Sequence, residues 1–186
     1  MEEDAHHFFI TICAAGVCGG MEIIMIGLIV AYSKNHVIGN KGMIPWKING
    51  EQKRFKELTT GNVVVMGRRT FEEIGKPLPN RTTLLVSRTM KYEAINCKTV
   101  SSLDEAIKMA GDRDIYISGG AMLYEEALPL VDKMFVTIIE KDIEGDTYFP
   151  YFNEADFEKT FEEKHGGVDP YTYLTYKRIK INDNSI

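Results

Sequence analysis

Short, largely apolar runs alternate along the chain with polar segments that contain glycine or proline, and this pattern predicts a β-sheet. The predicted strands are residues 25–31, 63–66, 82–86, 98–100, 114–118 and 133–140. Runs such as Val63-Val64-Val65-Met66 are apolar without a break, which is typical of central strands covered on both faces. The central strands should therefore lie between layers of helices.

Helical patterns fall between these strands. We predict helices over 49–59, after Gly67, over 102–110 and after Gly120, with loops over 33–45 and 144–150. Asn49 is the expected N-cap of the first helix, and Ser102 with Glu105 has the spacing of a capping box. Residues 157–164 and 171–181 alternate in polarity and predict a closing hairpin. The sequence thus predicts a single-domain, three-layer α/β fold, with a central mostly parallel sheet of about eight strands, an antiparallel C-terminal edge and about four flanking helices.

Composition and charge exclude some classes of function. The chain has 186 residues and a formal net charge of −5, which suits one domain and argues against binding to nucleic acid or to an anionic membrane. No apolar run is long enough to span a bilayer. The three cysteines, Cys13, Cys18 and Cys97, have neither a disulfide framework nor a metal-binding spacing, which favours a cytoplasmic protein with no metal site.

Residues 1–24 precede the first predicted strand, and we expect them to be a disordered extension or not part of the native protein. The apolar stretch from Phe8 to Cys18 is short and follows acidic residues, whereas a secretory signal begins with a positively charged region. A working start at Met21 or Met25 is the alternative to a native extension. The predicted folded domain therefore spans residues 25–186.

Glu51 is the candidate catalytic carboxylate. Glu51, Phe55 and Leu58 lie at positions i, i+4 and i+7 of the first predicted helix, so they share one face. A carboxylate turned inward beside Phe55 would be desolvated, and its pKa would be disturbed. The alternative is a solvated glutamate in the first turn that favours the helix dipole. The preceding segment contains Gly39 and Gly42, which suit the hinges of a lid over the same site.

Basic and glycine-rich segments follow three of the predicted strands and indicate a site for phosphate groups. Gly67-Arg68-Arg69-Thr70 opens a helix, whose first N–H groups are free to bind an anion. Ser87-Arg88 and Gly119-Gly120 end other strands, where ligands of α/β sheets bind. The alternatives are a Thr70–Glu73 capping box with solvated arginines, and an ordinary strand-to-helix turn at the glycine pair. The Rossmann spacing of glycines is absent.

From about residue 25 to residue 181 the chain resembles dihydrofolate reductase. The segments that carry the resemblance occur in the order of that family. They are Ile38-Gly39, Pro45-Trp46, Glu51 with Phe55, Met66-Gly67-Arg68 with Thr70, Pro77-Leu78-Pro79-Asn80-Arg81, Gly119-Gly120 with Tyr124, Thr137, Glu144-Gly145-Asp146-Thr147 and Phe149-Pro150. The resemblance implies NADPH-dependent reduction of 7,8-dihydrofolate to 5,6,7,8-tetrahydrofolate, which supplies one-carbon metabolism, by a cytoplasmic monomer that also binds antifolate inhibitors.

The resemblance implies roles on the substrate side. Glu51 would hydrogen-bond the 2-amino group and the adjacent ring nitrogen of the pterin, supported by Thr137 and water. Hydride would pass to the imine carbon, and the proton would reach the neighbouring nitrogen through water admitted by the lid, with Glu51 setting the electrostatics. Arg81 would bind the α-carboxylate of the glutamate tail. The implied catalytic residues are Glu51, Thr137 and Trp46, and the implied substrate-binding residues are Ile29, Val30, Glu51, Gln52, Phe55, Ile74, Leu78, Arg81 and Thr137.

The resemblance also implies a set of cofactor-binding residues. Ala31 and Ile38 would meet the nicotinamide amide through backbone groups. The pyrophosphate would lie against Gly67, Arg69, Thr70, Gly120, Ala121, Met122 and Leu123, and the 2′-phosphate against Arg68, Ser87 and Arg88. Gly39, Ser118, Gly119 and Tyr124 complete the implied NADPH site. The lid would comprise Gly39, Gly42 and Ile44, tethered by Asp146.

Glu51 and Gln52 depart from the pattern of most bacterial members of the family that the chain resembles. Those members have aspartate at the position of Glu51 and an apolar residue at the position of Gln52. Gly50-Glu51-Gln52 resembles instead some plasmid-borne, trimethoprim-insensitive members. Glutamate is one methylene longer than aspartate, which moves the carboxylate that a diaminopyrimidine must pair with. Ser118, which is aliphatic in many relatives, changes the same pocket. We therefore expect an active enzyme with reduced sensitivity to trimethoprim.

Two rival functions remain to be distinguished. The reductase domain of riboflavin synthesis shares the fold and the use of NADPH, but it does not need Trp46, Glu51 and Arg81 together. A catalytically silent paralogue would bind nucleotide without turnover, and the presence of both Glu51 and Thr137 argues against it.

Overall fold

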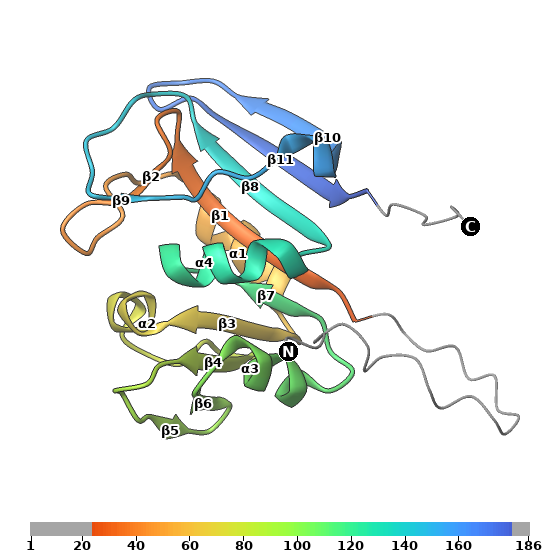
Figure 1. Cartoon of the computed structure of the whole chain (residues 1–186). Coiled ribbons are helices and arrows are strands. Elements are labelled where there is room, and N and C mark those ends of the chain that lie inside the picture. The colour runs from red at the N-terminus through yellow and green to blue at the C-terminus, as the bar shows by residue number, and fades with distance from the viewer. Residues whose placement is uncertain (1–23, 180–186) are drawn as a thin grey trace, which may run out of the picture.

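The computed structural model describes residues 24–179, which form a three-layer α/β fold around one large sheet (Figure 1). The sheet has nine strands. In spatial order they are β10 (Phe157–His165), β11 (Tyr171–Arg178), β8 (Lys133–Ile139), β1 (Ile26–Ser33), β7 (Ile115–Ile117), β3 (Val63–Gly67), β4 (Thr82–Val86), β6 (Cys97–Val100) and β5 (Glu93–Ala94). The strands from β8 to β6 are parallel, whereas β10, β11 and β5 each run antiparallel to the adjacent strand. The predicted mostly parallel sheet with an antiparallel C-terminal edge is confirmed.

Two α-helices cover each face of the sheet. α1 (Glu51–Thr59) and α2 (Arg68–Ile74) pack on one face, and α3 (Leu103–Ala110) and α4 (Ala121–Ala127) pack on the other. Short 3₁₀ turns occupy Leu128–Leu130 and Glu154–Asp156. A separate two-stranded ribbon joins β2 (Val37–Gly39) to β9 (Thr147–Tyr148), and in Figure 1 it lies at the left, toward which the arrowheads of β1 and β3 point. The ribbon therefore borders the carboxyl edge of the parallel sheet.

Strand β3 illustrates why an unbroken apolar run forms a central strand. Val63 and Val65 belong to the core beneath α3 and α4, whereas Val64 and Met66 belong to the core beneath α1 and α2. All four side chains are fully buried. Because successive side chains of a strand point to opposite faces, one strand supplies both cores. Burying each of these side chains contributes roughly 1.5–3 kcal/mol, which fixes both helical layers on the sheet.

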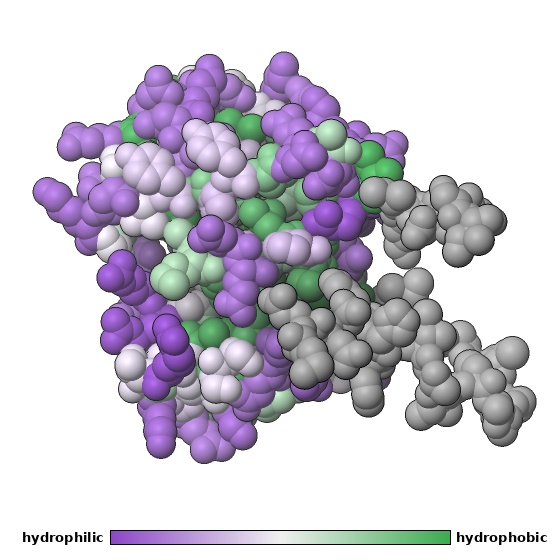
Figure 2. All heavy atoms as spheres, viewed as in Figure 1, coloured by the Kyte–Doolittle hydropathy of each residue, from purple (hydrophilic) through white to green (hydrophobic). Residues whose placement is uncertain are grey.

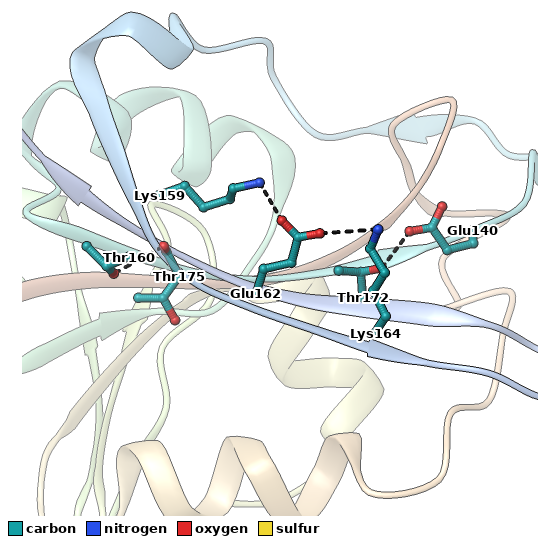
Figure 3. Close-up of polar contacts among 7 residues, drawn as sticks. All are labelled: Glu140, Lys159, Thr160, Glu162, Lys164, Thr172 and Thr175. Atoms are coloured by element: carbon teal, nitrogen blue, oxygen red, sulfur yellow. Dashed lines mark hydrogen bonds and ion pairs between the residues drawn. The ribbon is translucent and has the colours of Figure 1, made fainter.

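Charged side chains protect the exposed outer strand β10. Glu162 lies within ion-pairing distance of both Lys159 and Lys164, and Thr172 of β11 donates a 2.6 Å hydrogen bond to Glu140 (Figure 3). Figure 2 shows mainly hydrophilic side chains over this hairpin. Such charges discourage a free sheet edge from pairing with another chain.

Three short strands were not expected from the sequence. The segments 33–45 and 144–150 are not loops throughout, because they contain β2 and β9, and β5 precedes β6. Each of these strands forms only when it meets its partner, so local polarity does not reveal it. The last strand ends at Arg178 and not at residue 181.

The predicted N-cap of α1 is wrong, and the alternative capping box at Thr70 does not form. α1 begins at Glu51 and its N-cap is Gly50, with φ 94°, so Asn49 lies outside the helix. α2 begins at Arg68 after Gly67, which places Thr70 inside the helix and rules out its capping box with Glu73. The carboxylate of Glu73 instead accepts a 3.1 Å hydrogen bond from the N–H of Ile44.

The starts of α3 and α4 were predicted correctly, and α4 begins directly after Gly120. Ser102 caps α3 and accepts a 3.1 Å hydrogen bond from the N–H of Glu105. The predicted extension lies, except for Ile24, outside the described residues, together with Cys13 and Cys18. Cys97 is a buried free thiol. Between residues 24 and 179, no helix is long and apolar enough to cross a membrane.

Candidate active site

Glu51 and Thr137 form a carboxylate–hydroxyl pair between α1 and β8. Thr137 Oγ1 lies 3.0 Å from one carboxylate oxygen of Glu51 and 3.1 Å from the other. Thr137 is fully buried and Glu51 is half-buried, so one end of the pair is held in the core and the other is partly exposed to solvent. The first turn of α1 thus turns Glu51 inward, as its spacing with Phe55 predicted.

The surroundings of Glu51 have two opposing effects on its pKa. Burial raises the pKa of the carboxyl above its ordinary value of 4.5. The hydrogen bond from Thr137 and the positive charge of Arg54 oppose that increase, but burial outweighs them. This half-buried carboxylate, which Thr137, Arg54 and Tyr173 help to keep charged, lies where a ligand with N–H donors can replace its lost water.

This pKa shift predicts a pH-dependent cost of keeping Glu51 charged. Because the folded protein binds the Glu51 proton more tightly than the unfolded chain does, the resulting stabilisation is fully present below the unfolded pKa. It is lost as the pH rises through the higher folded pKa. The free energy of unfolding of the wild type, relative to that of Glu51→Gln, should therefore fall as the pH rises from about 4.5. Urea unfolding of both proteins across pH measures this difference, and a difference that is constant or rises with pH would contradict the shift.

Arg54 belongs to the same cluster, although the sequence analysis did not select it. Its Nη1 donates a 3.0 Å hydrogen bond to Thr137 Oγ1, and its guanidinium lies over the ring of Tyr173, 3.9 Å from the centroid. The missed signal was its position three residues after Glu51, which places both on neighbouring parts of one helix surface. The apolar pattern of that face does not reveal a charged residue such as Arg54.

Apolar side chains from α1, α2 and the following turn form one wall beside Glu51. Phe55, Ile74 and Leu78 pack on the core that contains Met66. Ile29 is 7% exposed and alternates with Val30 along β1, so Ile29 shares the face of Thr137. Val30 points into the opposite core, which leaves only its backbone on the substrate side. Gln52 is exposed and Trp46 is half-buried.

Arg81 is held in one orientation near this wall. Its Nε donates to the carbonyl of Pro79 at 3.0 Å, and its Nη1 donates to Thr59 Oγ1 at 3.2 Å. The side chain is only 6% exposed and its guanidinium lies 5.7 Å from the centroid of the Phe55 ring. Since a guanidinium has five N–H groups, it still has donors for a carboxylate. The arrangement is that of a pre-oriented anion-binding group.

Three glycines bring backbone groups together where β3 and β7 end. Gly67 N–H donates a 2.8 Å hydrogen bond to the carbonyl of Gly119. Gly119 has φ 136°, and a Cβ there would lie 2.6 Å from Thr70 Oγ1, while a Cβ on Gly67 would lie 3.6 Å from the nitrogen of Gly120. Side chains at these positions would fill a surface that glycine leaves bare. The surface therefore fits a dinucleotide pyrophosphate, which needs close approach to backbone N–H groups.

The other residues expected at the cofactor lie around these glycines, with different degrees of exposure. Arg68, Arg69 and Arg88 are exposed at the carboxyl edge of the sheet, where Arg68 lies 3.7 Å from Glu72. Ser87 Oγ accepts hydrogen bonds from the N–H groups of Thr89 and Met90. Met122 is 80% exposed, Ala31, Ile38, Gly39 and Ala121 are half-buried, Leu123 and Tyr124 are buried, and Ser118 Oγ lies 3.5 Å from the carbonyl of Val65.

Tyr124 and Leu123 can offer a ligand only their backbone. The hydroxyl of Tyr124 donates a 2.8 Å hydrogen bond to the carbonyl of Ile29, which ties α4 to β1. Leu123 is part of the same core. Both side chains position the glycine turn and do not line its surface.

The predicted lid is a hairpin turn held to the β9 segment. Asn40 and Met43 pair through backbone hydrogen bonds, and Lys41 and Gly42 have φ values of 51° and 81°. Lys41 N–H donates a 2.9 Å hydrogen bond to Asp146, which lowers the pKa of that carboxyl. Ile44 is 53% exposed and is held through the Glu73 contact described above. The structure thus places Asp146 beside the segment that contains Gly39, Gly42 and Ile44, to which it is joined by hydrogen bonds.

Comparisons with known proteins all match the chain to dihydrofolate reductases. The family model described as dihydrofolate reductase matches residues 25–178. The chain is 44% identical over 159 residues to dihydrofolate reductase type A13 of Escherichia coli, an alignment that covers 84% of this chain and 96% of the relative. It is 37% identical over 160 residues to dihydrofolate reductase of Bacillus subtilis (strain 168), covering 83% and 95%.

A solved structure gives the same result for the fold. Dihydrofolate reductase from Enterococcus faecalis, complexed with NADP(H) and RAB-propyl, superposes with a TM-score of 0.76 at 34% identity. The superposition covers 83% of this chain and 96% of the other. Within residues 24–179, no group of three or more histidine, cysteine, aspartate or glutamate side chains could hold a metal ion.

Proposed function

The chain belongs to the dihydrofolate reductase family of NADPH-dependent oxidoreductases, and from that premise we propose that it reduces 7,8-dihydrofolate to 5,6,7,8-tetrahydrofolate. The observation that carries the proposal is the half-buried Glu51 carboxylate, hydrogen-bonded to the buried hydroxyl of Thr137. A charged acceptor in a largely apolar site suits a pterin, which is flat, apolar on both faces and lined with N–H donors at one edge.

The residues of this chain would mainly position and polarise the substrate. Bound NADPH supplies the hydride that the imine carbon of the pterin receives. Glu51 would accept hydrogen bonds from the 2-amino group and the adjacent ring nitrogen, which orients the imine carbon. The proton would come from water near the neighbouring nitrogen, and the negative charge of Glu51 would favour its transfer. The apolar wall that includes Phe55 and Leu78 would exclude other water.

Arg81 would bind the tail of the substrate, and the glycine surface would bind the pyrophosphate of the cofactor. Arg81 would pair with the α-carboxylate of the glutamate tail. Gly67, Gly119 and Gly120 would accept the pyrophosphate, and the exposed Arg68 and Arg88, with Ser87, would meet the 2′-phosphate. The lid would close over the nicotinamide through the segment that Asp146 fastens. Trp46, at the base of the lid, would line the site.

We also propose a metabolic role, a cellular location and an oligomeric state for this enzyme. Tetrahydrofolate would supply one-carbon metabolism in the cytoplasm, and the enzyme would act as a monomer formed by the domain that starts near residue 25. Antifolates would bind in the pterin site, because they present the same N–H donors to Glu51.

The direct test is the rate of NADPH oxidation, followed by absorbance, with dihydrofolate and separately with the pyrimidine substrate of riboflavin synthesis. We expect oxidation with dihydrofolate alone. Oxidation with the pyrimidine would contradict the proposal and support a reductase of riboflavin synthesis. Binding of NADPH without turnover of either compound would contradict it in favour of a catalytically silent paralogue.

Reduced sensitivity to trimethoprim is a separate prediction of the pterin site. Shortening the acid in Glu51→Asp should move the carboxylate toward the position that a diaminopyrimidine prefers, so the inhibition constant of trimethoprim should fall by about tenfold, equivalent to about 1.4 kcal/mol. Methotrexate, whose glutamate tail would also meet Arg81, is the comparison and should change less. An inhibition constant of the wild type as low as that of a sensitive bacterial enzyme, or no change in Glu51→Asp, would contradict this prediction.

A further inference from the structure

We propose that Arg54 is a positioning residue that fixes the direction of the hydrogen bonds in the Glu51–Thr137 pair and keeps Glu51 a charged acceptor. This inference rests on the proposed function, in which Glu51 accepts hydrogen bonds from the pterin. It adds a residue that acts through Thr137 and Glu51 and does not itself need to touch the substrate.

The direction of the hydrogen bonds follows from which groups can donate. A guanidinium only donates, so the 3.0 Å contact between Arg54 Nη1 and Thr137 Oγ1 must have the hydroxyl oxygen as acceptor. The hydroxyl has a single hydrogen, and both oxygens of Glu51 lie within 3.1 Å of Thr137 Oγ1. That hydrogen is therefore donated to Glu51. A chain of two hydrogen bonds runs from the guanidinium to the carboxylate, and it is satisfied when the carboxylate is ionised.

The sheet holds Arg54 in the position that this chain of hydrogen bonds requires. Tyr173 of β11 is the register partner of Thr137 of β8, so the two residues are adjacent across the antiparallel pair. The guanidinium lies 3.9 Å from the centre of the Tyr173 ring and contacts Thr137 at the same time. A cation stacked on an aromatic ring is restrained by that contact, and the stack itself is favourable.

The charged and titratable groups around Arg54 come from three elements. They are Glu51 on α1, Tyr171 and Tyr173 on β11, and Glu163 on β10. A shallow pocket between α1 and this hairpin exposes the outer side of Arg54 and is lined also by Lys53, Glu57 and Phe161. Burial lowers the pKa of Arg54, but guanidinium stays protonated at any pH at which the enzyme works. Burial likewise raises the pKa of Tyr173, so its hydroxyl stays neutral.

Arg54 therefore supplies a fixed positive charge behind a carboxylate that burial tends to neutralise. Its effect opposes the burial that raises the pKa of Glu51. A protonated Glu51 would lose one acceptor oxygen and could not satisfy both N–H donors of a pterin. Arg54 thus extends to lower pH the range in which the site binds its substrate.

The test compares three variants of the full chain. Arg54→Gln removes the charge and keeps an N–H donor, Arg54→Lys keeps the charge without the planar fork, and Lys53→Gln is the matched control. Lys53 is a neighbouring cation on α1 whose side chain is 80% exposed and pairs with Glu57 at 3.8 Å. The readout is the titration of the Glu51 carboxyl carbon by NMR with labelled glutamate, in which Glu51→Gln identifies the signal.

We expect the titration midpoint to move to higher pH in Arg54→Gln, to move less in Arg54→Lys, and to stay unchanged in Lys53→Gln. Below both midpoints, the KM for dihydrofolate in Arg54→Gln should rise by about tenfold for each pH unit of that displacement, because one unit is a factor of ten in the ionised fraction. At alkaline pH the KM should approach that of the wild type.

Two outcomes overturn the inference. The first is a midpoint in Arg54→Gln equal to that of the wild type, and the second is an equal displacement in Arg54→Lys, which would show that charge is not the cause. Arg54→Met, which keeps the stem over Tyr173, serves as the charge-free variant if Arg54→Gln does not fold. A wild type without dihydrofolate turnover would contradict the proposed function, while the titration would still decide the role of Arg54.

Discussion

Replacing Glu51 with glutamine is expected to lower kcat/KM for dihydrofolate by about 100- to 1000-fold at neutral pH, the range found when a charge-stabilising group is removed from an active site. The amide has nearly the same shape, but it carries no negative charge and points an N–H group at the pterin donors. Binding of NADPH, measured by fluorescence, should change little, because Glu51 lies between α1 and β8 and away from the glycine surface. The loss should therefore appear in turnover and in pterin binding.

The control for this variant is Glu57→Gln, which changes the same residue type on the same helix. Glu57 is 65% exposed at its side chain and pairs with Lys53. Its replacement should leave kcat/KM within about twofold of the wild type, since exposed ion pairs contribute little. If the kcat/KM of Glu51→Gln were close to that of Glu57→Gln, Glu51 would have no role in catalysis.

Replacing Arg81 with methionine is expected to raise the KM for dihydrofolate by about 100-fold. Two charged hydrogen bonds to the tail carboxylate would be lost, and a net loss of about 1.5 kcal/mol for each corresponds to this change, while the apolar stem would be kept. The specific readout is a 7,8-dihydropterin without the glutamate tail, for which the wild type and Arg81→Met should have similar KM values. Steady-state kinetics with both substrates separates tail recognition from a general loss of the site.

Arg81 also supports the fold, which the experiment must take into account. Its substitution leaves the carbonyl of Pro79 and the hydroxyl of Thr59 without a donor, so the variant should unfold at lower urea concentration. Arg113→Met is the matched control, because Arg113 lies near Arg81 at the same small pocket and donates to Thr82 at 2.7 Å. It should lose stability without a change in KM. Equal effects of Arg81→Met on both substrates would contradict a role in binding the tail.

The architecture could be predicted from the sequence because its central strands are apolar throughout. Val63 to Met66 must be covered on both faces, and together with the helices predicted between the strands this requirement indicates a three-layer fold. Strands β2, β5 and β9 could not be predicted, since each has two or three residues and depends on a partner that the sequence does not place nearby. The same limit explains why the alternative capping box at Thr70 does not form, because Glu73 accepts a hydrogen bond from Ile44, which is 29 positions away.

The candidate site was predictable only where its residues belong to a local motif. Glu51 stood out through its spacing with Phe55, and the glycines stood out between strand and helix. Arg54 did not, because its importance comes from Thr137 and Tyr173, which are brought beside it by β8 and β11. A charged residue on a helix surface acquires such a role only through tertiary structure.

The most direct test of the central claim uses NADPH that carries deuterium at C4 of the nicotinamide, in place of the hydrogen that is transferred. The position of the deuterium is followed while the enzyme reduces dihydrofolate. Mass spectrometry of the product should find one deuterium in each tetrahydrofolate formed, in step with the oxidation of NADPH, and Glu51→Gln should form little product. Oxidation of NADPH without labelled tetrahydrofolate, or equal product from Glu51→Gln, would contradict hydride transfer at the Glu51 site.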